Sequence, residues 1–397
     1  MLQTVYHGLA QRPTLSSLTI KFPALRLPRP VILIPPIPKL KTLKITDIDP
    51  LCYPDDISLL LLGSKNLRDL RLHWSPRMRD GLEPSVTLHS YFGRCIAADY
   101  KLPVEYVAFH NLYAQQTEDF EKIFNPNKIQ GITMINSLAG VGDSAETIFV
   151  DDTWRMKPSK FIQNLKTMRG DKWSRAHCDL LGKTTGLQKL YLIGAKKEVK
   201  EQADSTANGT RSQTGSPGTP GTPATPGGFS ANSLGKDYLA VLSENHGATL
   251  RHLLLASQWR LGSDDIAKLV RSCPNLEQLG LGIEKSDFDL FRLLLPFLPK
   301  LFAIRILDNP KSSAFSDELK AHSDRFHERK VAKEISKREY SSLKWVGMCD
   351  MAFEVGRIIP LGEFAENGEP MYMRAVKRVS LDAVKDVEIW GLDSLEI

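Results

Sequence analysis

The sequence predicts an α/β solenoid, in which short parallel strands line a concave face and helices cover the convex face. Two observations carry this prediction: one apolar phrase recurs along the chain, and helical patterns separate its copies. The 397 residues are 42% hydrophobic and carry a formal net charge of only +6. This composition is typical of a chain that buries a core, and it excludes wholesale disorder.

The phrase consists of an apolar residue, two variable residues, an apolar residue, one variable residue and a third apolar residue. Alternation over its last positions predicts a strand with one buried face. Several starts lie 22 to 27 residues apart, the length of one strand–loop–helix unit. Such a unit is too small to bury its own apolar face, so we expect a horseshoe of about eleven irregular leucine-rich repeats. The phrase starts at Leu15, Leu40, Leu67, Val104, Ile129, Leu165, Leu187, Leu250, Leu276, Leu301 and Leu343.

Helix signals lie between the phrases. Acidic residues precede the apolar run that ends at Gly63, and Ser263 with two aspartates opens a second helix. The segment 286–295 has capping-box spacing and is followed by Pro296, which predicts a third helix. The highly charged stretch from Phe315 to Tyr340 predicts a solvated helix.

The chain divides at one insert. Residues 1–203 hold the N-terminal repeats, and residues 234–310 continue the same solenoid. Residues 311–340 hold the charged helix, and residues 341–397 hold the last repeat and a β-hairpin that caps the solenoid. The range 204–233 is predicted to be disordered, because 20 of the 27 residues from Asp204 to Ser230 are Gly, Pro, Ser or Thr.

Four Ser-Pro or Thr-Pro dipeptides in this insert are candidate sites for proline-directed phosphorylation. A passive tether explains the same composition and stays open as the alternative. The candidate sites are Ser216, Thr219, Thr222 and Thr225.

No motif predicts catalysis, so we expect a non-enzymatic protein that needs no cofactor and no metal. Gly182-Lys183-Thr184 resembles the end of a P-loop, but His177 stands where that motif requires glycine. The alternatives are an enzyme that uses His177 and Cys178, and a weak nucleic-acid interaction through Lys44 and Arg71. The mixed charges argue against nucleic acid as a partner.

Targeting signals and cysteines predict the compartment. The five cysteines stand singly, and Met1 to Ala10 lack the pattern of a secretory signal. No apolar run approaches 18 residues, so we expect no membrane span. These features predict a cytoplasmic or nuclear protein with reduced thiols.

The variable residues of each phrase point away from the core and line the concave sheet. Aromatic residues and arginines most often dominate the energetics of protein interfaces. The sequence therefore predicts that this face binds a protein target. The candidate binding residues are Arg71, His73, Tyr106, His110, Arg169, Tyr191, Arg305 and Trp345.

Cys273-Pro274-Asn275-Leu276, two similar Pro-x-Leu starts and the segment 62–70 resemble fungal F-box/leucine-rich-repeat proteins. The resemblance covers most of the chain outside the insert. It implies the substrate receptor of a ubiquitin ligase: the F-box docks a Skp-type adaptor, and the repeats hold the target. The first phrase starts at Leu15, and Leu102-Pro103-Val104-Glu105, which matches an F-box motif, lies in repeat register. We therefore expect the F-box to have been lost or to be supplied upstream, and adaptor binding to require it.

Overall fold

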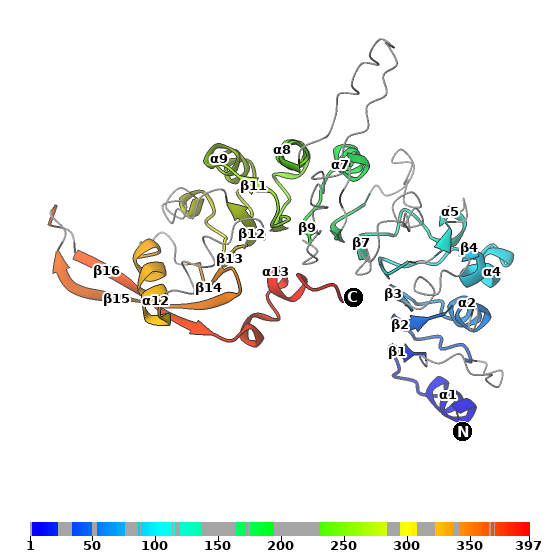
Figure 1. The fold of residues 1–397 in the computed structure, drawn as a ribbon. Coiled ribbons are helices and arrows are strands. Elements are labelled where there is room, and N and C mark those ends of the chain that lie inside the picture. Colours follow the sequence, from blue (N-terminus) through cyan, green and yellow to red (C-terminus); the bar gives the residue numbers. More distant parts are fainter. Residues whose placement is uncertain are drawn as a thin grey trace, which may run out of the picture.

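The computed structural model shows an α/β fold built on one open, mostly parallel sheet (Figure 1). In the described part of the chain, thirteen strands follow one another in chain order, and β11 (Arg260–Leu261) pairs with β12 off this path. A separate pair joins β4 (Val86–Thr87) to β6 (Ala114–Gln115). The described residues are 2–22, 34–49, 54–75, 86–87, 89–112, 114–115, 120–135, 164–171, 173, 175–193, 231–283, 294–307, 322–336, 342–364, 367–368 and 370–397.

Eleven strands of the sheet are parallel, each to the next in the path. They are β1 (Ser17–Lys21), β2 (Thr42–Ile48), β3 (Asp69–Trp74), β5 (Tyr106–His110), β7 (Gly131–Ile135), β8 (Thr167–Gly170), β9 (Lys189–Leu192), β10 (His252–Leu254), β12 (Gln278–Ile283), β13 (Ala303–Ile306) and β14 (Trp345–Met348).

The register places equivalent phrase positions side by side. The second apolar residue of one phrase lies opposite the second apolar residue of the next, and from Leu43 to Val346 all of them are buried. A shift of one residue would turn these side chains toward solvent, so burial holds the register. The row consists of Leu18, Leu43, Leu70, Val107, Ile132, Met168, Leu190, Leu253, Leu279, Ile304 and Val346. This architecture is compatible with the predicted solenoid.

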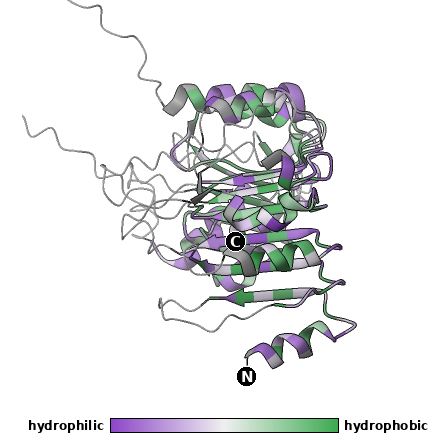
Figure 2. Ribbon diagram, turned by 90° about the vertical axis from the view of Figure 1, so that its right-hand side faces the viewer, coloured by the Kyte–Doolittle hydropathy of each residue, from purple (hydrophilic) through white to green (hydrophobic). Residues whose placement is uncertain are grey.

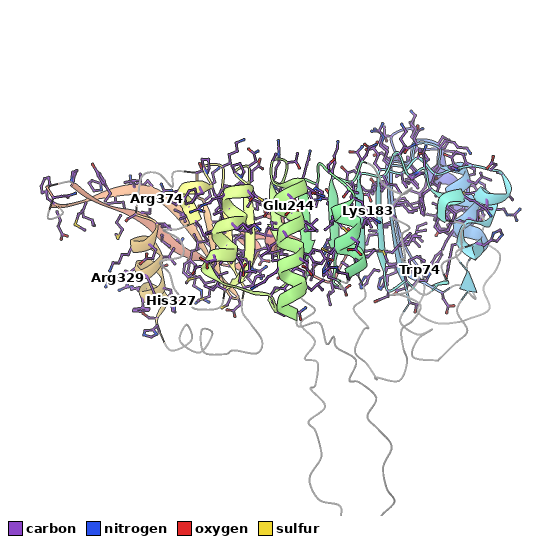
Figure 3. All side chains as sticks on the ribbon, turned by 90° about the horizontal axis from the view of Figure 1, so that it is seen from above. Trp74, Lys183, Glu244, His327, Arg329 and Arg374 are labelled. Carbon is purple, nitrogen blue, oxygen red and sulfur yellow. The ribbon has the colours of Figure 1, made fainter. Side chains whose placement is uncertain are left out.

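Helices cover the outer side of the arc, while the strands line its inner side (Figure 1). The predicted helix before Gly63 is α2, whose Ile57, Leu60 and Leu61 are fully buried. Figure 3 looks onto this side and shows Lys183 and Glu244 among the row of helices. Hydrophobic and hydrophilic residues alternate along the helices and strands in Figure 2, as expected when one face of each is buried. The helices are α2 (Pro54–Gly63), α4 (His89–Ala97), α5 (Phe120–Ile123), α7 (Arg175–Gly182), α8 (Ala231–Val241), the π-helix η1 (Leu242–His246) and α9 (Ser263–Ser272).

A row of polar side chains joins neighbouring units just before their strands. The amide of Asn275 donates to the carbonyl of Ala248 at 2.8 Å, and Asn66 donates to Pro38 in the same way. The hydroxyls of Thr249 and Ser342 donate to Leu187 and Pro299. Because each acceptor belongs to the preceding unit, this position ties one unit to the next. This role also explains the asparagine in the Pro-Asn-Leu start.

Two helices differ from the sequence prediction. A helix that was not predicted, α1 (Leu2–Ala10), precedes β1. The predicted solvated helix is α12 (Asp324–Glu334), and it is not solvated all round: it packs on β16 and buries His327, Val331 and Ala332 (Figure 3). The buried residues at 327, 331 and 332 form a narrow stripe that the overall charge of the helix conceals.

The predicted insert is described only at its end. Residues 204–230, including Ser216, Thr219, Thr222 and Thr225, lie outside the described residues. The range 231–233, which the prediction includes in the insert, belongs to α8. Most of the predicted helix 286–295 also lies outside; its described end is followed by Pro296 in a 3₁₀ turn, η2 (Leu295–Phe297).

The end of the chain forms a hairpin and then turns back. The antiparallel strands β15 (Met351–Phe364) and β16 (Pro370–Val379) extend the sheet beyond β14. After β16 come the 3₁₀-helix η4 (Leu381–Val384) and α13 (Glu388–Gly391). Figure 1 shows that this last part lies inside the arc, with the C-terminus near its middle. The prediction of a capping hairpin did not include this return. In the described part of the chain, no helix is both long and apolar enough to cross a bilayer.

Candidate functional site

The C-terminal segment, defined as residues 381–397, lies against the concave strands. Its Val384, Val387 and Ile389 are buried in one cluster with Tyr191 and Leu254, which belong to β9 and β10. Ile397 at the end of the chain is buried in a second cluster that includes Ala108, Ile135 and Ile193. The first cluster also includes Ala303 of β13, so the segment spans the concave face from β13 back toward β5.

Glu388 is the charged anchor of the C-terminal segment. Its carboxylate lies 2.6 Å from Lys189 Nζ and 2.7 Å from His252 Nδ1, and it accepts a hydrogen bond from the Tyr191 hydroxyl. Burial opposes ionisation of Glu388, but the hydrogen bonds from His252, Lys189 and Tyr191 outweigh it and hold its pKa at about 2. Burial and the bond to Glu388 raise the pKa of Tyr191, which stays a hydroxyl donor. The carboxylate is therefore ionised, and strands β9 and β10 bind it.

The next two residues of the segment contact β12, β13 and β14. The Ile389 amide donates to Gln278 Oε1 at 3.1 Å, and its carbonyl accepts from Arg305 Nη1 at 2.9 Å. Arg305 also lies 2.8 Å from Asp393 Oδ2 and 5.7 Å from the centre of the Trp390 ring. A Cβ atom built on Gly347 would lie 2.5 Å from Trp390, so glycine is what lets the indole approach β14.

Arg169 binds the main chain of the segment. Its Nε donates to the Leu392 carbonyl at 3.0 Å, and its Nη2 donates to the carbonyls of Ser394 and Glu396 at 2.7 and 2.8 Å. Burial, together with repulsion from Arg71, lowers the Arg169 pKa to about 10, so the guanidinium still carries its charge at neutral pH. Lys44 donates to the carbonyl of Ile397 and extends this set of contacts to β2. These contacts do not depend on the side chains of the segment.

The N-terminal candidates form a second group on β3 and β5. Arg71 pairs with Asp69 at 2.7 Å, which raises the Arg71 pKa. The rings of His73 and His110 stack with their centres 4.2 Å apart, and burial lowers the pKa of His73. Tyr106 is 44% exposed and lies over Gly131, where a Cβ atom would be 2.5 Å from its ring. This group presents aromatic and basic side chains at the edge of the C-terminal segment.

A cavity of about 500 Å³ lies between the two groups. Its walls include Asp69, Arg71 and Tyr106 on one side and Arg169 and Lys189 on the other; the C-terminal segment adds Lys385, Asp386, Glu388 and Ile397. This volume is in the range of small-molecule and peptide side-chain pockets. The segment therefore fills only part of the concave face.

The structure sorts the eight predicted binding residues into the two groups. Arg169, Tyr191 and Arg305 contact the chain's own C-terminal segment, and Trp345 is partly buried in the same apolar cluster. Arg71, His73, Tyr106 and His110 form the other group. The sequence predicts that all eight residues contact a partner protein. In the structure, the chain's own C-terminal segment contacts Arg169, Tyr191 and Arg305 of the first group.

Lys189, His252 and Gln278 are not among the binding residues predicted from the sequence. Lys189 and His252 bind the Glu388 carboxylate, and Gln278 accepts a hydrogen bond from the Ile389 amide. They occupy the phrase position that is equivalent to Tyr106, as the strand register shows. Selecting polar residues at every equivalent position, instead of aromatic and arginine residues alone, would have found them. Glu388 has no such signal, because it lies outside the phrases.

The alternative catalytic pair lies on the convex side. His177 and Cys178 belong to α7, where the His177 ring packs against Trp173 with centres 5.6 Å apart. Burial raises the Cys178 pKa to about 11, so the thiol is a weak nucleophile at neutral pH. In the described residues, no group of three His, Cys, Asp or Glu side chains is arranged to hold a metal ion.

Neither the protein-family models nor the curated proteins compared with this sequence gave a match.

Proposed function

We propose that this chain is a non-enzymatic protein-binding module whose concave face holds a protein target. One observation carries the proposal: charged and polar side chains from β8, β9, β10, β12 and β13 already bind a polypeptide segment on that face. They bind both side chains and main-chain carbonyls, as a peptide-binding surface must.

We further propose that the fold is a leucine-rich repeat solenoid of about eleven irregular repeats. The aligned apolar row from Leu18 to Val346 supports it, since stacking buries the apolar face of each unit. The polar ties from Asn66 and Asn275 to the preceding units support it as well.

The sequence resemblance supports a role as the substrate-recognition part of an F-box-type ubiquitin ligase receptor, or as a scaffold derived from one. In the first case a Skp-type adaptor would bind only with an F-box supplied upstream. Either role places the protein in the cytoplasm or nucleus, where single reduced cysteines are normal.

Affinity capture from an extract of cells that make this protein naturally tests the proposal. The full chain serves as bait beside Arg71→Ala/Tyr106→Ala, which alters the N-terminal group, and Lys268→Ala, an exposed residue of α9 on the convex side. We expect wild type and Lys268→Ala to retain the same proteins and the concave variant to lose them. Equal capture by all three baits would reject the concave face as the binding site.

The same capture addresses the ligase role. Recovery of a Skp-type adaptor with the chain as printed would show a docking element in these residues. Capture of a target without the adaptor is expected both of a scaffold and of a receptor whose F-box is supplied upstream.

A further inference from the structure

The C-terminal segment is attached to the concave face in the manner of a bound peptide. Residues 381–397, all of them described, add no strand to the sheet, and their two helices have four residues each. Their polar contacts to the strands come from strand side chains, as with Arg169, Gln278 and Arg305. The segment can therefore leave without breaking a backbone hydrogen bond of the sheet.

Three consecutive residues carry side chains that the face recognises separately. Glu388 sits among Lys189, Tyr191 and His252; Ile389 is fully buried; and Trp390 lies against Gly347. The face thus selects a carboxylate, an aliphatic side chain and an indole in this order. Beyond them, Arg169 accepts any sequence because it binds main-chain carbonyls.

The fit of the segment is incomplete. Arg305 Nε and Trp390 Nε1 are buried at this contact and have no hydrogen-bond acceptor among the described residues. A cavity of about 500 Å³ lies beside Glu388 and Ile397. It leaves room on this face for contacts beyond those that the segment makes.

We propose that strands β8 to β14 form a site for an acidic linear segment of a partner protein, and that residues 388–397 occupy this site in cis until the partner displaces them. The partner segment carries the same chemistry: a carboxylate, an aliphatic side chain and an aromatic side chain in succession. This inference rests on the proposed function and names the class of partner. The cis segment is tethered and therefore has a high effective concentration at the site. A partner must bind tightly enough to compete with it.

A fluorescein-labelled peptide with the sequence of residues 385–397 tests the site. It is titrated into three full-length chains: wild type, Glu388→Lys, and the control Asp382→Lys, which reverses an exposed charge in the same segment. Fluorescence anisotropy measures binding, and circular dichroism checks that each chain is folded. A second peptide carries Glu388→Lys.

We expect Glu388→Lys to release the cis segment and bind the native peptide saturably. Wild type and Asp382→Lys should bind it at least about tenfold more weakly, because the tethered segment competes. The Glu388→Lys peptide should bind the Glu388→Lys chain at least about tenfold more weakly than the native peptide does. Absence of saturable binding, or equal binding of the two peptides, would overturn the site.

Hydrogen exchange on the wild-type chain tests displacement without a variant. The Ile389 amide donates to Gln278 and is protected only while the segment is bound. We expect this amide to exchange at least about tenfold faster than the amides of β12, because the segment opens while the sheet stays folded. Exchange as slow as in β12 would show that the segment opens only on global unfolding and would refute displacement.

The two proposals fail in different ways. Specific capture of a protein by the N-terminal group, with no peptide binding by Glu388→Lys, would reject the displacement site and keep the proposed function. Peptide binding without any captured protein would reject the proposed function and, with it, the external partner.

Discussion

Glu388 and Arg169 attach the C-terminal segment to the concave strands in complementary ways. Glu388 is a side chain of the segment that three strand residues recognise, whereas Arg169 is a strand side chain that recognises three carbonyls of the segment. Both are charged groups placed in a partly buried setting, where hydrogen bonds to charge are stronger than in water. Single substitutions at these two positions therefore have the largest expected effect on the segment.

Glu388→Gln should make a pH-dependent difference to stability. The pKa of Glu388 is lowered from 4.5 to about 2 in the folded chain, so its ionised form stabilises the fold. This contribution is complete above about pH 4.5 and is lost as the pH falls toward 2. The gap in free energy of unfolding between wild type and Glu388→Gln should shrink as the pH falls from about 4.5 toward 2. Urea titrations at each pH measure it; a gap that does not change would contradict the assignment.

Arg169→Lys should destabilise the chain although it keeps the charge. An ammonium cannot reproduce the planar fork that reaches the carbonyls of Leu392, Ser394 and Glu396 together. We expect a loss of about 1.5 to 3 kcal/mol in urea unfolding. The matched change Arg71→Lys, at a partly exposed pair with Asp69, should cost less than about 1 kcal/mol. Equal losses at both positions would contradict the role of the fork.

At the scale of elements, the concave strands carry small residues where the segment passes. Ala303 and Gly347 lie on β13 and β14, although glycine weakens a strand because its backbone is freer in the unfolded chain. Glycine is needed at position 347 because Trp390 and Arg305 approach this backbone closely. A Cβ atom on Gly347 would lie 2.5 Å from Trp390 and 2.9 Å from Arg305 Cγ. The shape of these strands is thus adapted to α13.

Gly347→Ala should loosen α13 from β14. The added methyl group requires Trp390 to move, and we expect a loss of about 1 to 3 kcal/mol together with faster proteolytic removal of the C-terminal segment. Urea unfolding and limited proteolysis followed by mass spectrometry measure the two effects. The control is Gly8→Ala in α1, where no atom lies within 4 Å of the new methyl; it should be neutral or stabilise by up to about 1 kcal/mol. Unchanged proteolysis of Gly347→Ala would refute the close contact.

At the scale of the whole molecule, two kinds of contact hold the chain together. Each parallel strand pairs with its neighbours, and one continuous apolar core runs behind the sheet from Ile20 to Val355. The C-terminal segment adds contacts between distant units, because it reaches from Arg305 on β13 to Lys44 on β2. Stability therefore depends on position along the stack and on this bridge.

Leu190→Ala and Leu18→Ala compare the middle of the stack with its end. Leu190 on β9 is fully buried between two strands, whereas Leu18 on β1 is only partly buried and β1 pairs with β2 alone. We expect Leu190→Ala to lower the free energy of unfolding by about 2 to 5 kcal/mol and Leu18→Ala by clearly less. Urea unfolding followed by circular dichroism measures both. A larger loss at Leu18 would contradict stabilisation by stacked neighbours.

Local periodicity accounts for the part of the fold that the sequence predicted. Each phrase contains its own buried and variable positions, so the strands, their faces and their shared register follow from residues close together in the chain. The same pattern named Arg169, Tyr191 and Arg305 as concave residues. It missed Lys189 and His252 because the choice favoured aromatic residues and arginine.

By itself, the sequence determined the row of parallel strands, the convex helices such as α2 and α9, and which side chains line the concave face. Only the tertiary structure decided that the chain's own residues 381–397 lie on that face. The reason is the distance along the chain: Arg169 binds a carbonyl 223 residues away, and Lys44 one that is 353 residues away. The repeat pattern predicts contacts between residues of the same or neighbouring units. The contacts of residues 381–397 depend instead on the curvature of the whole sheet and on the path of the chain after β16.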